Sequence, residues 1–207
     1  MDRPASARER LRDAAIGAFA RLGLDASLRE IAAEVGVSAG LFTHHFGTRE
    51  ALRAACDDEV VRRIRELQSD GIRRSTSEQL ATMGQIDEQG TTVTYLLRAV
   101  QAGGAPARAF LEHLLDDARE YVAEAVEAGI IRPSRDPEAR LRYLVTQQLG
   151  GMLLQATLLG ADLADGPAFL QRLAAETTLP SLELYTEGLL TSRELLDGYL
   201  ARLRATS

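Results

Sequence analysis

The spacing of apolar residues is the feature that most constrains the fold of this chain. Throughout its 207 residues apolar side chains recur every three or four positions, and no run of four to eight residues alternates as a half-buried strand would. Alanine and leucine, both strong helix formers, occur 32 times each. The pattern therefore predicts an all-α protein.

Capping residues, glycines and prolines divide this pattern into separate helices. Two Ser-x-x-Glu capping boxes, beginning at Ser6 and Ser27, predict the starts of the first two helices. Ser38 and Thr48 are the expected N-caps of the next two, the second of which runs to about residue 68. Later helices are predicted over 76–87, 92–102, 106–128, 136–160, 167–178, 181–189 and 192–204. The expected breaks between them include Gly90, 103–104, 129–137, 165–167 and Pro180.

Charge and composition restrict where the chain can bind and where it works. The net charge of −6 divides into +1 over residues 1–55 and −7 over 56–207, so any DNA binding is expected in the first quarter. Cys56 is the only cysteine, which excludes an internal disulfide, and we interpret it as a small buried hydrophobe. The first twenty residues lack the apolar core of a signal peptide, and the most apolar stretch, 149–164, contains Gln155 and Asp162. These features predict a cytoplasmic protein with no membrane span.

Residues 28–46 fit the geometry of a helix-turn-helix. Two short helices that cross steeply need a small residue at the crossing, which Ala32 supplies, and a turn residue with positive φ, which Gly36 supplies. The expected contacts between the helices come from Ile31, Val35, Val37 and Phe42. On these residues alone, a plain αα-corner of a helical protein fits as well as a DNA-binding unit.

Several short motifs follow one another at fixed spacings across the first 55 residues. They are AFARLG at 18–23, SLREIAA at 27–33, GVS at 36–38, Gly40, HF at 45–46 and TREAL at 48–52. Together they resemble the TetR-like transcriptional repressors. The resemblance implies a helix-turn-helix DNA-binding domain over 1–50, linked through a helix over 48–69 to an all-helical ligand-binding and dimerisation domain over 51–207.

The resemblance also implies which side chains contact DNA. The segment 38–45 corresponds to the recognition helix of the major groove, followed by phosphate-contacting residues at the start of the next helix. The implied DNA-binding residues are Arg29, Ser38, Ala39, Gly40, Leu41, Thr43, His44, His45, Thr48 and Arg49. Thr43 replaces the family's common tyrosine, and Leu41 stands where a small polar residue is frequent. A large aromatic contact is therefore missing here, and Leu41 is available to a thymine methyl group.

In the second domain the resemblance implies an inducer site and a dimer interface. Candidate pocket residues on its amphipathic helices, for each of which plain core packing is the alternative, are Met83, Tyr95, Phe110, Leu114, Tyr121, Gln148, Met152 and Gln155. Small residues at Gly150, Gly151, Ala156 and Gly160 allow close approach of a second helix. With the leucine-rich last helix, they predict an isologous four-helix dimer interface.

No catalytic or metal-binding pattern competes with this interpretation. The adjacent His44 and His45 project about 100° apart on a helix and cannot readily share one metal ion. The acidic stripe over 112–127 is interpreted as a solvated helix face, and none of the common catalytic motifs occurs. We therefore predict no enzyme, metal or cofactor. The sequence predicts a homodimeric repressor that binds a palindromic operator and is released by a small-molecule inducer. The alternative is a helical protein-interaction adaptor that has lost DNA binding.

Overall fold

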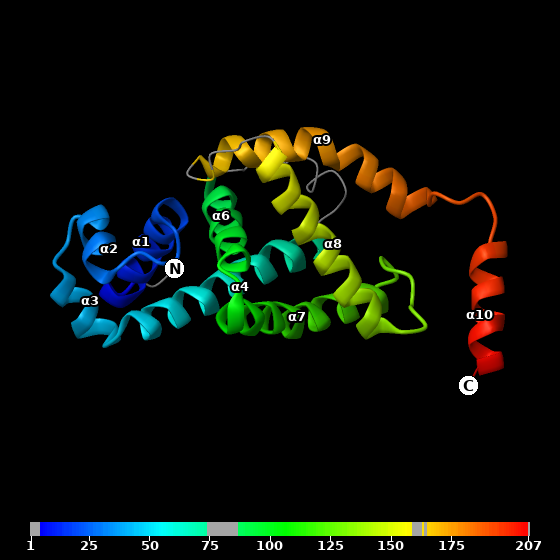
Figure 1. Cartoon of the computed structure of the whole chain (residues 1–207), viewed down its shortest axis with the longest axis horizontal. Coiled ribbons are helices and arrows are strands. Elements are labelled where there is room, and N and C mark those ends of the chain that lie inside the picture. Colours follow the sequence, from blue (N-terminus) through cyan, green and yellow to red (C-terminus); the bar gives the residue numbers. More distant parts are fainter. Residues whose placement is uncertain (1–4, 74–86, 159–162, 164, 207) are drawn as a thin grey trace. The chain divides into compact units, whose positions relative to one another are not determined.

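The computed structural model describes residues 5–73, 87–158, 163 and 165–206. Met83, Gly160 and nearly all of the helix predicted over 76–87 lie outside these residues. The described residues form helices and loops without a strand, which confirms the predicted all-α class (Figure 1). None of the helices in this part of the chain is long and apolar enough to cross a membrane.

The first three helices are short and begin and end where the sequence predicts. They are α1 (Ala7–Leu22), α2 (Leu28–Val35) and α3 (Ala39–Phe46). Both predicted capping boxes form: the Ser6 hydroxyl accepts the Glu9 N–H at 3.2 Å, and the Ser27 hydroxyl accepts the Glu30 N–H at 3.3 Å. Gly36 ends α2 in the left-handed conformation, at φ 76° and ψ 30°, as the helix-turn-helix requires.

The later helices differ in length from the predicted segments, some of them longer and others equal or shorter. They are α4 (Arg49–Arg73), α6 (Asp87–Gln101), α7 (Gly104–Glu127), α8 (Pro137–Leu158), α9 (Gly166–Glu187) and α10 (Glu194–Thr206). The predicted breaks at Gly90 and Pro180 are wrong, because α6 and α9 run through them. A proline removes one N–H, but its φ is helical, so an exposed helix can continue through it.

Gly90 serves close packing instead of ending a helix. A Cβ atom at Gly90 would lie 2.6 Å from the backbone nitrogen of Pro167, so the missing side chain lets α6 touch the start of α9. Gly166 faces the same contact, since a Cβ there would lie 2.6 Å from the Gly90 carbonyl oxygen. The sequence pattern shows a glycine in a helix but not the neighbour that requires it.

One buried cluster joins the first three helices to α4, α6, α7 and α8. Phe19 of α1, Phe42 of α3, Leu52 of α4 and Tyr95 of α6 are all fully buried in it. Contacts divide the chain into two compact units, 1–170 and 171–207. In the second unit most large apolar side chains are exposed, including Leu189 at 82%.

Candidate nucleic-acid interface

The helix-turn-helix is held by small and aromatic side chains between α2 and α3. Ala32 is 2% exposed and Ile31 is fully buried, so α2 presents a small and an aliphatic residue to its neighbours. On α3, Phe42 and Phe46 are buried, and their ring centroids lie 6.3 Å apart. This packing fixes which side of α3 faces the core and leaves the other side for solvent.

The solvent side of α3 carries the residues predicted to contact DNA. Gly40, Leu41, Thr43 and His44 are exposed, whereas Ala39 and His45 are half-buried. None of these residues is itself buried, and among them Ala39 packs against the buried cluster that contains the two phenylalanines. The structure therefore brings the predicted recognition residues together on one helix, with mostly small and neutral side chains available for base contacts.

Ser38 occupies the N-cap position of α3 without performing the predicted cap. Its side chain makes no capping hydrogen bond, in contrast to Ser6 and Ser27 at the starts of α1 and α2. Ser38 is exposed, so its hydroxyl is available to a phosphate or base at the start of the recognition helix. Thr48 does cap α4, because its hydroxyl accepts the Ala51 N–H at 3.1 Å.

The adjacent histidines lie in different environments at the end of α3. Their rings meet edge to face with centroids 5.1 Å apart, His44 exposed and His45 half-buried. No group of three potential metal-ligating side chains converges anywhere in the described ranges.

Arg49 has a structural role that the sequence did not reveal. Its Nε donates to the Ala26 carbonyl at 2.8 Å, and one Nη donates to the Leu24 carbonyl. The other Nη lies 3.9 Å from the Glu50 carboxylate. Arg49 thus ties the start of α4 to the loop between α1 and α2, so the residue predicted to contact phosphate also shapes the domain.

Arg8 is a basic residue near the recognition helix that sequence reasoning missed. Its Nε donates to the His45 carbonyl at 3.4 Å, and its guanidinium lies 4.8 Å from the centroid of the Phe46 ring. The exposed first turn of α1 therefore lies against the end of α3. The only sequence signal was a basic residue one helical turn before buried Leu11.

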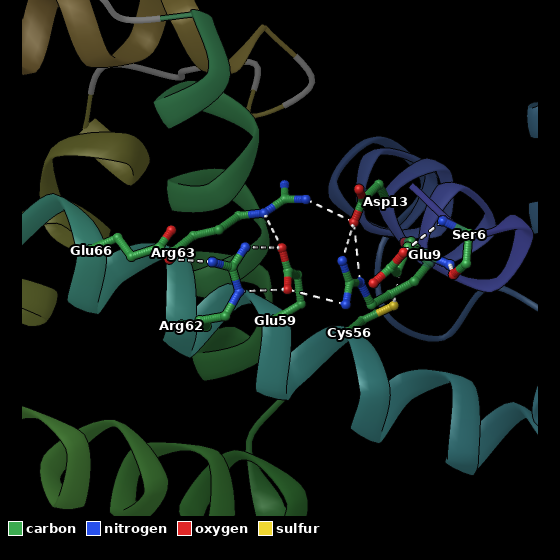
Figure 2. Close-up of polar contacts among 9 residues, drawn as sticks. Ser6, Glu9, Asp13, Cys56, Glu59, Arg62, Arg63 and Glu66 are labelled. Carbon is green, nitrogen blue, oxygen red and sulfur yellow. Dashed lines mark hydrogen bonds and ion pairs between the residues drawn. The ribbon is translucent and has the colours of Figure 1, made fainter. Parts of the chain in front are cut away.

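A closed ring of ion pairs joins α1 to α4. It consists of Arg12, Asp13, Glu59 and Arg63, which we call the α1–α4 ring (Figure 2). Glu59 lies 3.1 Å from Arg12 and 2.8 Å from Arg63, and Asp13 lies 3.0 Å from Arg12 and 2.8 Å from Arg63. Arg62 adds a further pair to Glu59 at 2.7 Å.

Glu59 is the buried member of the α1–α4 ring, at 4% exposure. Burial by itself raises the pKa of a carboxyl, but hydrogen bonds from Arg62 and Arg63 and the charge of Arg12 outweigh it and lower the pKa of Glu59 to about 2. Glu59 is therefore ionised at neutral pH and holds the N-terminal helix on α4.

Tyr95 connects α6 to both helices of this junction. Its hydroxyl donates to Asp57 of α4 at 2.7 Å, and its ring meets Phe19 of α1 edge to face at a centroid distance of 6.1 Å. Asp57 in turn pairs with Arg53 at 2.9 Å. Burial and the negative charge of Asp57 raise the pKa of Tyr95, so the hydroxyl stays protonated and can donate.

Cys56 lies in the same junction and is buried, as predicted. Burial, together with the charge of Asp57, raises the pKa of the Cys56 thiol. The thiolate needed for redox chemistry is therefore disfavoured.

The predicted pocket residues differ widely in burial. Tyr95, Phe110 and Leu114 belong to the buried cluster shared with the first three helices. The remaining described candidates are half-buried Tyr121, Met152 and Gln155 and exposed Gln148. Their joint role as a ligand site stays a prediction.

Comparison with known proteins agrees with this architecture. Residues 11–56 match the family model of bacterial regulatory proteins of the tetR family, and residues 87–191 match that of the tetracyclin repressor-like C-terminal domain. The HTH-type transcriptional regulatory protein RaaS of Mycobacterium tuberculosis is 42% identical over 197 residues, covering 95% of this chain and 92% of RaaS. The chain belongs to the TetR family. It is a ligand-responsive, DNA-binding regulator of transcription.

Solved structures of TetR-family regulators share the fold. PfmR from Thermus thermophilus matches with a TM-score of 0.54 at 16% identity, covering 91% of this chain and all of PfmR. TylP from Streptomyces fradiae matches with a TM-score of 0.54 at 25% identity, covering 88% of this chain and 98% of TylP. The family is one of transcriptional regulators rather than enzymes.

Proposed function

We propose that this TetR-family regulator is a cytoplasmic, non-enzymatic repressor. In this proposal it binds a palindromic operator as a homodimer and is released by a small-molecule inducer. The observation that carries the proposal is the exposed side of α3, which presents Leu41, Thr43 and His44 above a buried aromatic face. Such a helix fits the major groove, and because it contains no arginine, electrostatic attachment is left to flanking residues.

The flanking contacts in this proposal come from three helix starts. Arg29 is exposed in the first turn of α2, Arg8 lies in the first turn of α1, and Thr48 begins α4. Backbone N–H groups and the partial positive charge of a helix N-terminus favour phosphate oxygens at such positions. Arg49 supports DNA binding mainly by fixing the loop between α1 and α2, through its Nε and one Nη. Only its other Nη faces an exposed residue, Glu50.

Dimerisation is required because one short recognition helix reads only a few base pairs. An exposed side of α8 suits a second copy of the chain: Tyr143, Leu154 and Leu158 are 65%, 58% and 75% exposed. Between them, a Cβ atom on Gly150 or Gly151 would meet no atom within 4 Å. The apolar residues lie on one side of the helix, and the glycines permit close approach of a facing helix.

A charge placed on this side of α8 tests the proposed interface. Leu154→Glu should convert the dimer to monomer in sedimentation, because the new carboxylate would be buried against its symmetry mate. Gln148→Glu, an equal charge on a different side of α8, is the matched control and should remain dimeric. A Leu154→Glu variant that sediments as a dimer would remove α8 from the interface.

Inducer response is proposed to pass through α6. Tyr95 touches α1 through Phe19 and α4 through Asp57, so a shift of α6 disturbs the helices that position α3. Two recognition helices must lie about 34 to 36 Å apart to enter successive major grooves. An inducer that favours a different spacing by about 2 to 3 kcal/mol would weaken operator binding by roughly 30- to 150-fold.

DNA selection followed by titration tests the proposal as a whole. The purified protein should select DNA with two inverted half-sites centred about 10 base pairs, or a multiple of that, apart. The logarithm of its affinity should fall linearly with the logarithm of salt concentration. Absence of salt-dependent binding to any selected sequence would favour the adaptor alternative.

A further inference from the structure

Arg98 of α6 differs from the other half-buried arginines of the described chain. Arg12, Arg53 and Arg63 each pair with a carboxylate at 2.8 to 3.1 Å. Among the described residues Arg98 has no carboxylate or hydrogen-bond partner, and its Nε is shielded from solvent. A desolvated guanidinium N–H without an acceptor is costly, because it has lost its water without gaining a replacement.

Thr94 lies one helical turn before Arg98, and its side chain also lacks a hydrogen-bond partner within the described part of the chain. It is 1% exposed, and its hydroxyl oxygen has no hydrogen-bond partner among the described residues. Residues four apart project about 40° from each other on a helix, so the two groups share one strip of α6. The strip thus carries two adjacent donors, a charged N–H and a hydroxyl, without an acceptor.

The start of α9 adds a third favourable feature for an anion. A Cβ atom on Gly166, the first residue of α9, would lie 2.7 Å from the Thr94 hydroxyl oxygen, so the helix begins directly beside this strip. A helix N-terminus carries a partial positive charge. The one acidic group shown at this helix start, Asp165, is exposed and accepts the Ala168 N–H at 3.2 Å.

We propose that Arg98 and Thr94 bind the anionic group of a small-molecule effector: a carboxylate, a sulfonate or a phosphate ester. The inference rests on the ligand response included in the proposed function and adds the chemical class of the ligand. An oxyanion offers several lone pairs to both donors, and it supplies a negative charge that would pair with the guanidinium of Arg98. Tyr95 precedes Arg98 by three residues, so the anion would bind one turn from the contact with α1 and α4.

Two fluorescent probes that differ by one anionic group provide the test. They are 1-anilinonaphthalene-8-sulfonate and N-phenyl-1-naphthylamine, the same aromatic amine without the sulfonate. Each is titrated into the full-length wild-type protein, Arg98→Met, Arg98→Lys, Thr94→Val and the control Arg108→Met, an exposed arginine of α7. Thermal melting confirms that each variant is folded, and release of the selected operator is recorded in the same samples.

The proposal predicts that only the anionic probe depends on the strip. Arg98→Met should weaken sulfonate binding by roughly tenfold or more, since hydrogen bonds to charged groups are worth at least that factor. It should leave the neutral probe within about twofold. Thr94→Val should weaken the sulfonate less and melt no lower than wild type, because it removes an unpaired buried hydroxyl. Arg98→Lys should retain part of the preference, and Arg108→Met all of it.

Two results would overturn the proposal. One is sulfonate binding to folded Arg98→Met at wild-type affinity, and the other is failure of the wild-type protein to bind the sulfonate. If the neutral probe still binds and releases the operator in either case, the ligand-responsive repressor stands and only the anionic class is wrong. If neither probe binds the wild-type protein and neither releases the operator, the proposed release of the operator by an inducer loses its support as well.

Discussion

Replacing Glu59 by glutamine removes the one buried carboxylate of the α1–α4 ring while keeping the size of the side chain. Arg12, Arg62 and Arg63 would then share no anion at their centre, because their contacts of 3.1, 2.7 and 2.8 Å all end on the Glu59 carboxylate. Arg12 and Arg63, at 22% and 28% exposure, would keep only Asp13 as a partner, so the loss of the buried carboxylate is destabilising.

The lowered pKa of Glu59 sets the size of this effect. A shift from 4.5 to about 2 corresponds to about 3 kcal/mol of folding free energy at neutral pH. Urea unfolding of Glu59→Gln at pH 7 should show a loss of about that size. The matched control is Glu66→Gln on the same helix, where Glu66 is 60% exposed and pairs with Arg62. Exposed pairs contribute less than about 1 kcal/mol, so this variant should stay near wild type.

The pH dependence provides an independent check of the same argument. Because the pKa of Glu59 is lower in the folded state than in the unfolded state, its contribution is present above about pH 4.5 and is lost as the pH falls towards 2. The stability difference between wild type and Glu59→Gln should therefore be constant from pH 5 to 8 and shrink below that range. A Glu59→Gln variant within about 0.5 kcal/mol of wild type at pH 7 would refute the reasoning.

Three further substitutions test local features of the fold. Gly36→Val should lower the melting temperature and DNA binding together, because a β-branched residue at φ 76° is strained by roughly 1 to 3 kcal/mol; unchanged melting would contradict this. Gly90→Ala should lower the free energy of unfolding by roughly 1 to 3 kcal/mol, because the new Cβ would lie 2.6 Å from the Pro167 nitrogen. The control Gly198→Ala, where a Cβ meets no atom within 4 Å, should raise it. Arg49→Met should lower melting and DNA affinity together, and lost affinity at unchanged melting would indicate a phosphate contact alone.

Local sequence determined the start of the fold and the position of the recognition helix. The boxes at Ser6 and Ser27 and the turn at Gly36 depend on residues within a few positions of one another, so their patterns predict the structure directly. The alternation of buried Phe42 with exposed Leu41 and Thr43 follows from helical periodicity in the same way.

Contacts between residues far apart in the chain were decided only by the tertiary structure. Gly90 was predicted to break a helix, because the sequence does not show that Pro167 packs against it. Arg49 reaches carbonyls 23 and 25 positions earlier, and Glu59 meets an arginine from α1. The unpaired state of Arg98 is also a tertiary fact, since it depends on which carboxylates the fold brings near. Local patterns fix helices and turns, whereas burial and pairing depend on how those helices pack.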